Sequence, residues 1–174
     1  QGPVDMVPRG KGLVGLHRYE SGSVSTLWTT PDGWSWFEQP SAFNVRMRAI
    51  EVGNGVFVSV GDHGAIWTSS DGTAWTSASG PTIDLDRAAW NDVAFAASGS
   101  RRVSDGDSKV SGNEAEKAVI GGNGLQWGPN LTTGLTLAAG GQGLFVAVGA
   151  SPLYPRSSTF SSLDASEWKE LSTL

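Results

Sequence analysis

The sequence predicts an all-β protein in which four repeats each supply four short antiparallel strands. Glycine and tryptophan are both abundant, with 24 Gly and 8 Trp among 174 residues, whereas only 17% of the residues are charged. This composition favours tight turns, short strands and aromatic packing over helices. Two separate sequence motifs also recur along the chain at matching intervals, which is the signature of a repeat architecture.

The first motif is ten residues long and occurs three times. In each copy an aspartate lies four residues after an aromatic residue and four residues before a tryptophan. The first two aspartates are 39 residues apart and the last two are 93 apart, about two units of 46, so a fourth copy is expected between them. The three copies are LWTTPDGWSW (Leu27–Trp36), IWTSSDGTAW (Ile66–Trp75) and TFSSLDASEW (Thr159–Trp168).

The hidden copy is assigned to Leu125–Leu135, where the turn has lost its signature. Trp127 takes the first aromatic place, Leu131 the aspartate place and Leu135 the final tryptophan place. A second motif gives the same period independently, because NGVFVSVG and QGLFVAVG begin 88 residues apart. Its clear copies are Asn54–Gly61 and Gln142–Gly149, and its weaker copies are Lys11–Arg18 and Lys117–Gly122.

These spacings predict one domain over residues 6–174, with repeats at about 6–41, 45–81, 86–132 and 134–174. Alternation of the kind seen in Val56–Val60 is typical of strands, so each repeat reads as a four-stranded antiparallel unit. Units of this size and composition predict a β-propeller of four blades. The ring either closes as a small propeller or forms part of a larger one, through self-association or within a longer parent chain.

The first motif resembles the Asp-box, or BNR repeat, of sialidase-like β-propellers, with one residue fewer between the aspartate and the final aromatic. In that family the Asp-box is a structural turn between the third and fourth strands of a blade, away from the active-site face. The resemblance therefore implies that the aspartates hold turns, which is also what a short carboxylate beside glycine does in general. The matching residues are Thr30, Asp32, Gly33, Trp36, Ser69, Asp71, Gly72, Trp75, Ser162, Asp164 and Trp168.

Catalysis by this chain is not expected. Enzymes of the sialidase-like family use an arginine cluster, a Tyr–Glu nucleophile pair and an acidic residue on one face of six blades. This chain has two tyrosines, Tyr19 and Tyr154, and its nearest match to the family's arginine motif, Tyr154–Arg156, has the wrong order. The alternative is that the chain is a fragment of a sialidase-like glycosidase.

Composition excludes several kinds of partner and cofactor. The net charge of −5 and pI of about 4.9 argue against nucleic acid, and no stretch is apolar enough to insert into a membrane. The chain has no cysteine, and we expect neither a metal site nor a cofactor. Residues 1–5 (QGPVD) are interpreted as a scar of tag cleavage and cloning; the alternative is a processed secreted protein with an N-terminal glutamine.

Two features of the sequence have no counterpart in the other repeats and are candidate binding elements. Trp34 is an extra aromatic residue inside the first Asp-box, where it could stack on a ligand or pack on the neighbouring blade. The polar segment 98–118 interrupts the third repeat and is predicted to be a loop or arm inserted between its first and second strands. Its charged candidates for contacting a partner are Arg101, Arg102, Asp105 and Asp107.

The sequence thus favours a non-catalytic recognition or assembly module with a protein partner, extracellular or on a virion surface. A carbohydrate-binding, lectin-like propeller is the alternative.

Overall fold

The computed structural model of the chain describes residues 5–18, 24–40, 43–100, 117–122, 126–127, 131–132, 134–150 and 157–171. In these ranges the chain forms sixteen β-strands and one short 3-10 helix, η1 (Asp62–Gly64). Within the same ranges no helix has the length and apolar character needed to cross a membrane.

The strands form four antiparallel sheets of four strands each, and in every sheet the strands follow one another in chain order. The first sheet contains β1 (Asp5–Arg9), β2 (Gly12–Arg18), β3 (Ser25–Thr30) and β4 (Phe37–Gln39). The second contains β5 (Met47–Gly53), β6 (Val56–Gly61), β7 (Ile66–Ser69) and β8 (Thr76–Ala78). The third contains β9 (Asp84–Trp90), β10 (Phe95–Ser100), β11 (Lys117–Gly122) and β12 (Leu131–Thr132). The fourth contains β13 (Leu135–Gly141), β14 (Leu144–Ala150), β15 (Ser157–Ser162) and β16 (Lys169–Glu170).

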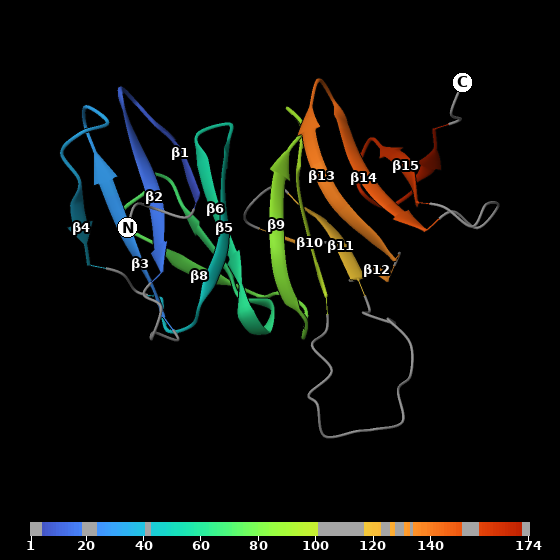
Figure 1. Cartoon of the computed structure of the whole chain (residues 1–174), viewed down its shortest axis with the longest axis horizontal. Helices are drawn as coiled ribbons and strands as arrows, with labels where there is room; N and C mark the ends of the chain where they lie inside the picture. Colours follow the sequence, from blue (N-terminus) through green and yellow to red (C-terminus); the bar gives the residue numbers. More distant parts are fainter. Residues whose placement is uncertain are drawn as a thin grey trace.

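The four sheets are arranged as the blades of a β-propeller. The first strands of successive sheets pack against one another, β1 on β5, β5 on β9 and β9 on β13. The predicted fold class, an all-β protein of four four-stranded blades, is therefore confirmed. The ring is open, because β1 does not pack along β13, and the first and fourth blades lie at opposite ends of the molecule (Figure 1).

Apolar residues are buried between the blades in three clusters, one at each boundary. The boundary of the second and third blades is centred on Val58, Val60 and Phe95. The boundary of the first and second blades is centred on Leu16, Phe57 and other apolar side chains. A third cluster, around Phe145, joins the third and fourth blades. Because the core lies between sheets, the central strands of the second and third blades are packed on both faces.

The turn between the first two strands begins with a residue of positive φ in three blades. Asn54, Asp92 and Gln142 occupy the same place in the second, third and fourth blades, and all three have positive φ. Asn and Asp adopt this left-handed region more readily than most residues. The match of Asp92 to Asn54 shows that the second motif has its third copy in Asp92–Gly99, and not in Lys117–Gly122 as the sequence suggested.

The predicted position of the insertion in the third blade was therefore wrong. Phe95–Ser100 is the second strand of this blade and Lys117–Gly122 is the third, paired directly with it. The intervening segment joins the second and third strands, and Ser98–Ser100 and Lys117–Ala118 belong to the strands rather than to a loop. The sequence was misleading because this strand, FAASGS, has only small residues after Phe95, which suit a strand packed closely on both faces.

Small differences remain at the predicted boundaries. The first strand of the third blade begins at Asp84, two residues before the expected start of that repeat at 86. Asp5, which had been set aside with the terminal segment, is the first residue of β1. Its Oδ2 accepts a hydrogen bond of 2.9 Å from the backbone N–H of Ile50 in the second blade. Asp5 therefore takes part in the first blade boundary.

Candidate functional site

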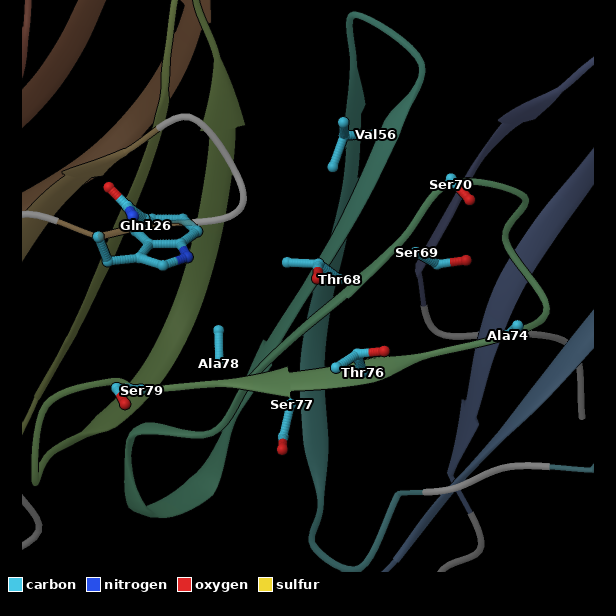
Figure 2. A pocket seen from close by; sticks show the side chains of 11 residues that line it. Val56, Thr68, Ser69, Ser70, Ala74, Thr76, Ser77, Ala78, Ser79 and Gln126 are labelled. Atoms are coloured by element: carbon cyan, nitrogen blue, oxygen red, sulfur yellow. The ribbon is translucent and has the colours of Figure 1, made fainter.

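A groove of about 830 Å³ runs along the outer strands of the second blade. It follows the β7–β8 hairpin, and residues 126–127 of the third blade border it on the other side (Figure 2). The lining residues are Val56, Thr68, Ser69, Ser70, Ala74, Thr76, Ser77, Ala78, Ser79, Gln126 and Trp127.

One position along the groove holds a small polar residue where the first blade has an aromatic one. Thr76 pairs with Thr68 across β7 and β8, as Phe37 pairs with Thr29 across β3 and β4. At the first blade boundary Phe43 also fills space, with its ring centroid 5.6 Å from that of Trp67 and 5.4 Å from that of Trp75.

The lining of the groove is neutral. None of its eleven described residues is an acid, a base or a histidine, so these side chains offer hydroxyl, amide and indole groups but no proton-transfer pair. The indole nitrogen of Trp127 is buried and has no hydrogen-bond partner within the described part of the chain. The Trp127 side chain also packs against the core of the second boundary, so it is held in place by the fold.

One edge of the groove is the turn of the ten-residue aspartate motif in the second blade. Oδ1 of Asp71 accepts hydrogen bonds of 2.8 Å from the backbone N–H groups of Thr73 and Ala74, and one of 3.0 Å from the Ser69 hydroxyl. The Ser69 hydroxyl oxygen in turn accepts from the N–H of Gly72 at 2.8 Å. The backbone N–H groups of Ala74 and Thr73 hold the pKa of Asp71 well below its ordinary value.

The first blade has the same turn. Asp32 accepts from the backbone N–H groups of Trp34 and Ser35, at 2.8 Å each, and from Thr30 at 3.0 Å. The N–H groups of Ser35 and Trp34 lower the pKa of Asp32 to about 2. Gly33 in this turn has a φ of +80°, a conformation that glycine adopts without strain.

The fourth blade repeats the turn with alanine in place of glycine. Asp164 accepts from the hydroxyl and the N–H of Ser166, at 2.7 and 2.8 Å, and the Ser166 hydroxyl is the main cause of its lowered pKa. Ala165 adopts a φ of +64° here. Ser162 and Trp168 keep the positions that the motif predicts, and the Trp168 indole donates to the Ala165 carbonyl at 3.1 Å.

The third blade carries a copy of the motif that the sequence analysis placed incorrectly. Lys117–Gly122 is the third strand, so Trp127 follows that strand and does not take the first aromatic place. Trp127 packs at the second boundary as Trp75 packs at the first, which is the behaviour of the final tryptophan, and Leu135 belongs to the next blade. Residues 123–125 lie outside the described residues.

Among the predicted binding residues, the structure describes Trp34, which does not line the groove. Trp34, at the β3–β4 hairpin, is 89% exposed, so it does not pack on a neighbouring blade within the described part of the chain. Arg101, Arg102, Asp105 and Asp107 lie outside the described residues. The groove residues Thr68, Thr76 and Gln126 carried no sequence signal beyond their place beside the motif.

A charged cluster joins the second and third blades. Arg48 pairs with Asp62, with Asp84 at 2.9 Å and with Asp86 at 2.7 Å. Burial opposes the charge of Arg48, but the hydrogen bond to Asp62 and the charges of the three aspartates raise its pKa. Since the Arg48 guanidinium is paired with these three carboxylates, we interpret the cluster as a structural contact that joins the two blades. Among the described residues no group of three or more His, Asp or Glu side chains is placed to hold a metal ion.

No protein-family model and no curated protein sequence matches the chain. Membership of the Asp-box family therefore stays a prediction. Among solved structures the chain is similar to one described as YCF48 bound to D1 peptide, with 15% sequence identity and a TM-score of 0.41. The similarity covers 97% of this chain and 66% of that chain, so this chain spans just under two thirds of its length. The blade assignment rests on the strand order and packing described above.

Proposed function

We propose that the chain is a non-catalytic recognition module of the β-propeller type and that its ligand binds in the groove between the second and third blades. One observation carries this proposal, the neutral lining of hydroxyl, amide and indole groups. Such a surface can hold a polar ligand through hydrogen bonds and one aromatic contact. Its described residues include no paired acid and base of the kind that hydrolysis of a glycoside requires.

Carbohydrate is the ligand class that this chemistry favours. Sugars present hydroxyl groups that donate and accept hydrogen bonds, which Thr68, Thr76 and Gln126 can complement, and an apolar ring face that a tryptophan can contact. The same reasoning supports a location outside the cell or on a virion surface, where glycans are displayed. A protein partner is the alternative, and an extended peptide could use the same hydroxyl groups.

A glycan array followed by titration calorimetry on the best ligand tests the proposal. We expect saturable binding of one neutral glycan class. Gln126→Ala and Thr76→Val should each weaken it about tenfold, the effect of losing roughly 1.4 kcal/mol of hydrogen bonding. Trp34→Ala is the matched control, because this exposed side chain lies outside the groove lining and should leave affinity unchanged.

Other results would overturn parts of the proposal. Binding that is lost in Trp34→Ala but kept in both groove variants would move the site to the β3–β4 hairpin. A blank array with saturable peptide binding would replace the carbohydrate with a protein partner. Release of sugar from any bound glycoside by the purified chain would contradict the non-catalytic assignment.

A further inference from the structure

The three blade boundaries are built in the same way: one face of each blade packs against the opposite face of the next blade. The cross-strand register shows which residues lie on each face. We call the side of a blade that faces the next blade in the chain its leading face, and the opposite side its trailing face. In the second blade Val58, Val60 and Ile66 lie on the leading face, in the cluster shared with the third blade. Ile50 and Phe57 lie on the trailing face, in the cluster shared with the first blade.

The leading face of the fourth blade has the same central strand pattern but no blade against it. Phe145 pairs with Ser162 as Phe57 pairs with Ser69, so Val148 occupies the place of Val60. Val60 is 0% exposed, whereas Val148 is 43% exposed. The apolar side chains of this open face are Leu144, Val146 and Val148.

The trailing face of the first blade is open in the complementary way. Met6, Gly15 and Trp28 form a cross-strand row, as Ile50, Ser59 and Trp67 do in the second blade. Ile50 is 4% exposed in its boundary, whereas Met6 is 44% exposed. The half-buried Trp28 and Trp36 lie where the second blade places Trp67 and Trp75 against its neighbour.

We propose that the leading face of the fourth blade docks on the trailing face of the first blade of a second copy of this chain. A second copy is the occupant because one chain carries both halves of the boundary, at opposite ends of its arc (Figure 1). The contact would continue the series that already joins β1 to β5, β5 to β9 and β9 to β13. Made reciprocally by two copies, it completes a ring of eight blades, within the range known for propellers.

The new boundary is more polar than the internal ones. Thr136 and Thr159 flank Val148 across the sheet, where Ala49 and Ile66 flank Val60. Less apolar area is therefore removed from water, and we expect reversible association that depends on protein concentration. This inference does not rest on the groove or on its ligand.

Sedimentation velocity on the whole chain, from about 1 to about 100 µM, tests the contact. We expect the wild type to shift from monomer to dimer across this range. Val148→Arg and Met6→Arg should each stay monomeric, because each places a charge in one half of the contact. Val93→Arg is the matched control, since Val93 lies in the β9–β10 turn, is 71% exposed and belongs to neither end face.

Mixing the Val148→Arg and Met6→Arg variants tests more directly which two faces make the contact. The Val148→Arg copy keeps an intact first blade and the Met6→Arg copy an intact fourth blade, so the mixture should form a one-to-one dimer through a single contact. A wild type that stays monomeric throughout, or a mixture that does not associate, would overturn the proposal. Circular dichroism checks that each variant is folded, and Leu144→Arg replaces Val148→Arg if the latter is not.

Discussion

Replacing Asp71 by alanine would test whether its carboxylate holds the hairpin that borders the groove. Oδ1 of Asp71 accepts two backbone N–H groups and the Ser69 hydroxyl, and alanine leaves all three donors without this acceptor. Thr73 is half-buried and Ala74 is exposed, so water can replace part of what is lost. We therefore expect the free energy of unfolding to fall by about 1–2 kcal/mol, the cost of losing a local capping group.

Urea unfolding followed by tryptophan fluorescence measures this change, which for a chain of this size corresponds to a drop in Tm of about 2–8 °C. Asp71→Asn should cost less, because the amide oxygen can still accept hydrogen bonds. Glu167→Ala serves as the control, since this exposed carboxylate accepts no side-chain hydrogen bond from the described residues, and its effect should stay within about 0.5 kcal/mol.

The pH dependence gives a second readout of the same turn. The pKa of Asp71 is lowered in the folded state, and that of Asp32 is lowered to about 2. A carboxylate of this kind stabilises the fold above its unfolded pKa of about 4, and the contribution is lost as the pH falls through the folded pKa. Wild-type stability should therefore fall below about pH 4, and Asp71→Asn should reduce the slope. If Asp71→Ala behaves like Glu167→Ala and leaves the acid slope unchanged, the turn-holding role is refuted.

Three further substitutions test the packing. Gly99→Ala should destabilise the third blade by about 3 kcal/mol in urea unfolding, because the added Cβ would lie 1.8 Å from the Asp84 carbonyl oxygen; wild-type stability would contradict the close approach. Phe43→Ala should cost about 3 kcal/mol through loss of its contacts with Trp67 and Trp75, and a cost below about 1 kcal/mol would show that these rings do not support the first boundary. Arg48→Met should cost about 3 kcal/mol in urea unfolding, because it leaves the carboxylates of Asp62, Asp84 and Asp86 without their shared cation; a cost below about 1 kcal/mol would argue against the charge cluster.

The sequence predicted the blades wherever the repeat keeps its marker residues. A hairpin is predicted by the turn residues Thr30, Asp32 and Gly33 and by their counterparts in other repeats. A central strand is predicted by the alternation of apolar and polar residues in Val56–Val60. Both signals are local, so they can be read from one copy of the motif. The number of blades followed from spacing alone, because 93 residues are too many for one unit.

The third blade was misread because its physical requirements differ from those of an exposed strand. Ala96 and Ala97 are fully buried on opposite faces, and Gly99 lies against the backbone at Asp84. Such a strand needs small side chains, and a run of small residues is also what a loop contains. The groove could not be predicted for a related reason. It is an unfilled space between side chains such as Thr76 and Trp127, which lie far apart in the sequence.

The turns of the ten-residue aspartate motif connect local hydrogen bonding to the assembly of the blades. In the second blade the turn held by Asp71 is followed by Trp75, which is buried in the boundary with the preceding blade. Trp168 packs against the third boundary in the same way, and Trp127 against the second. The carboxylate thus fixes a hairpin whose tryptophan closes the gap to the blade before it. Trp36 is the corresponding tryptophan of the first blade, which has no preceding blade in the described structure. Its ring is half-buried, and a second copy of the chain would cover it.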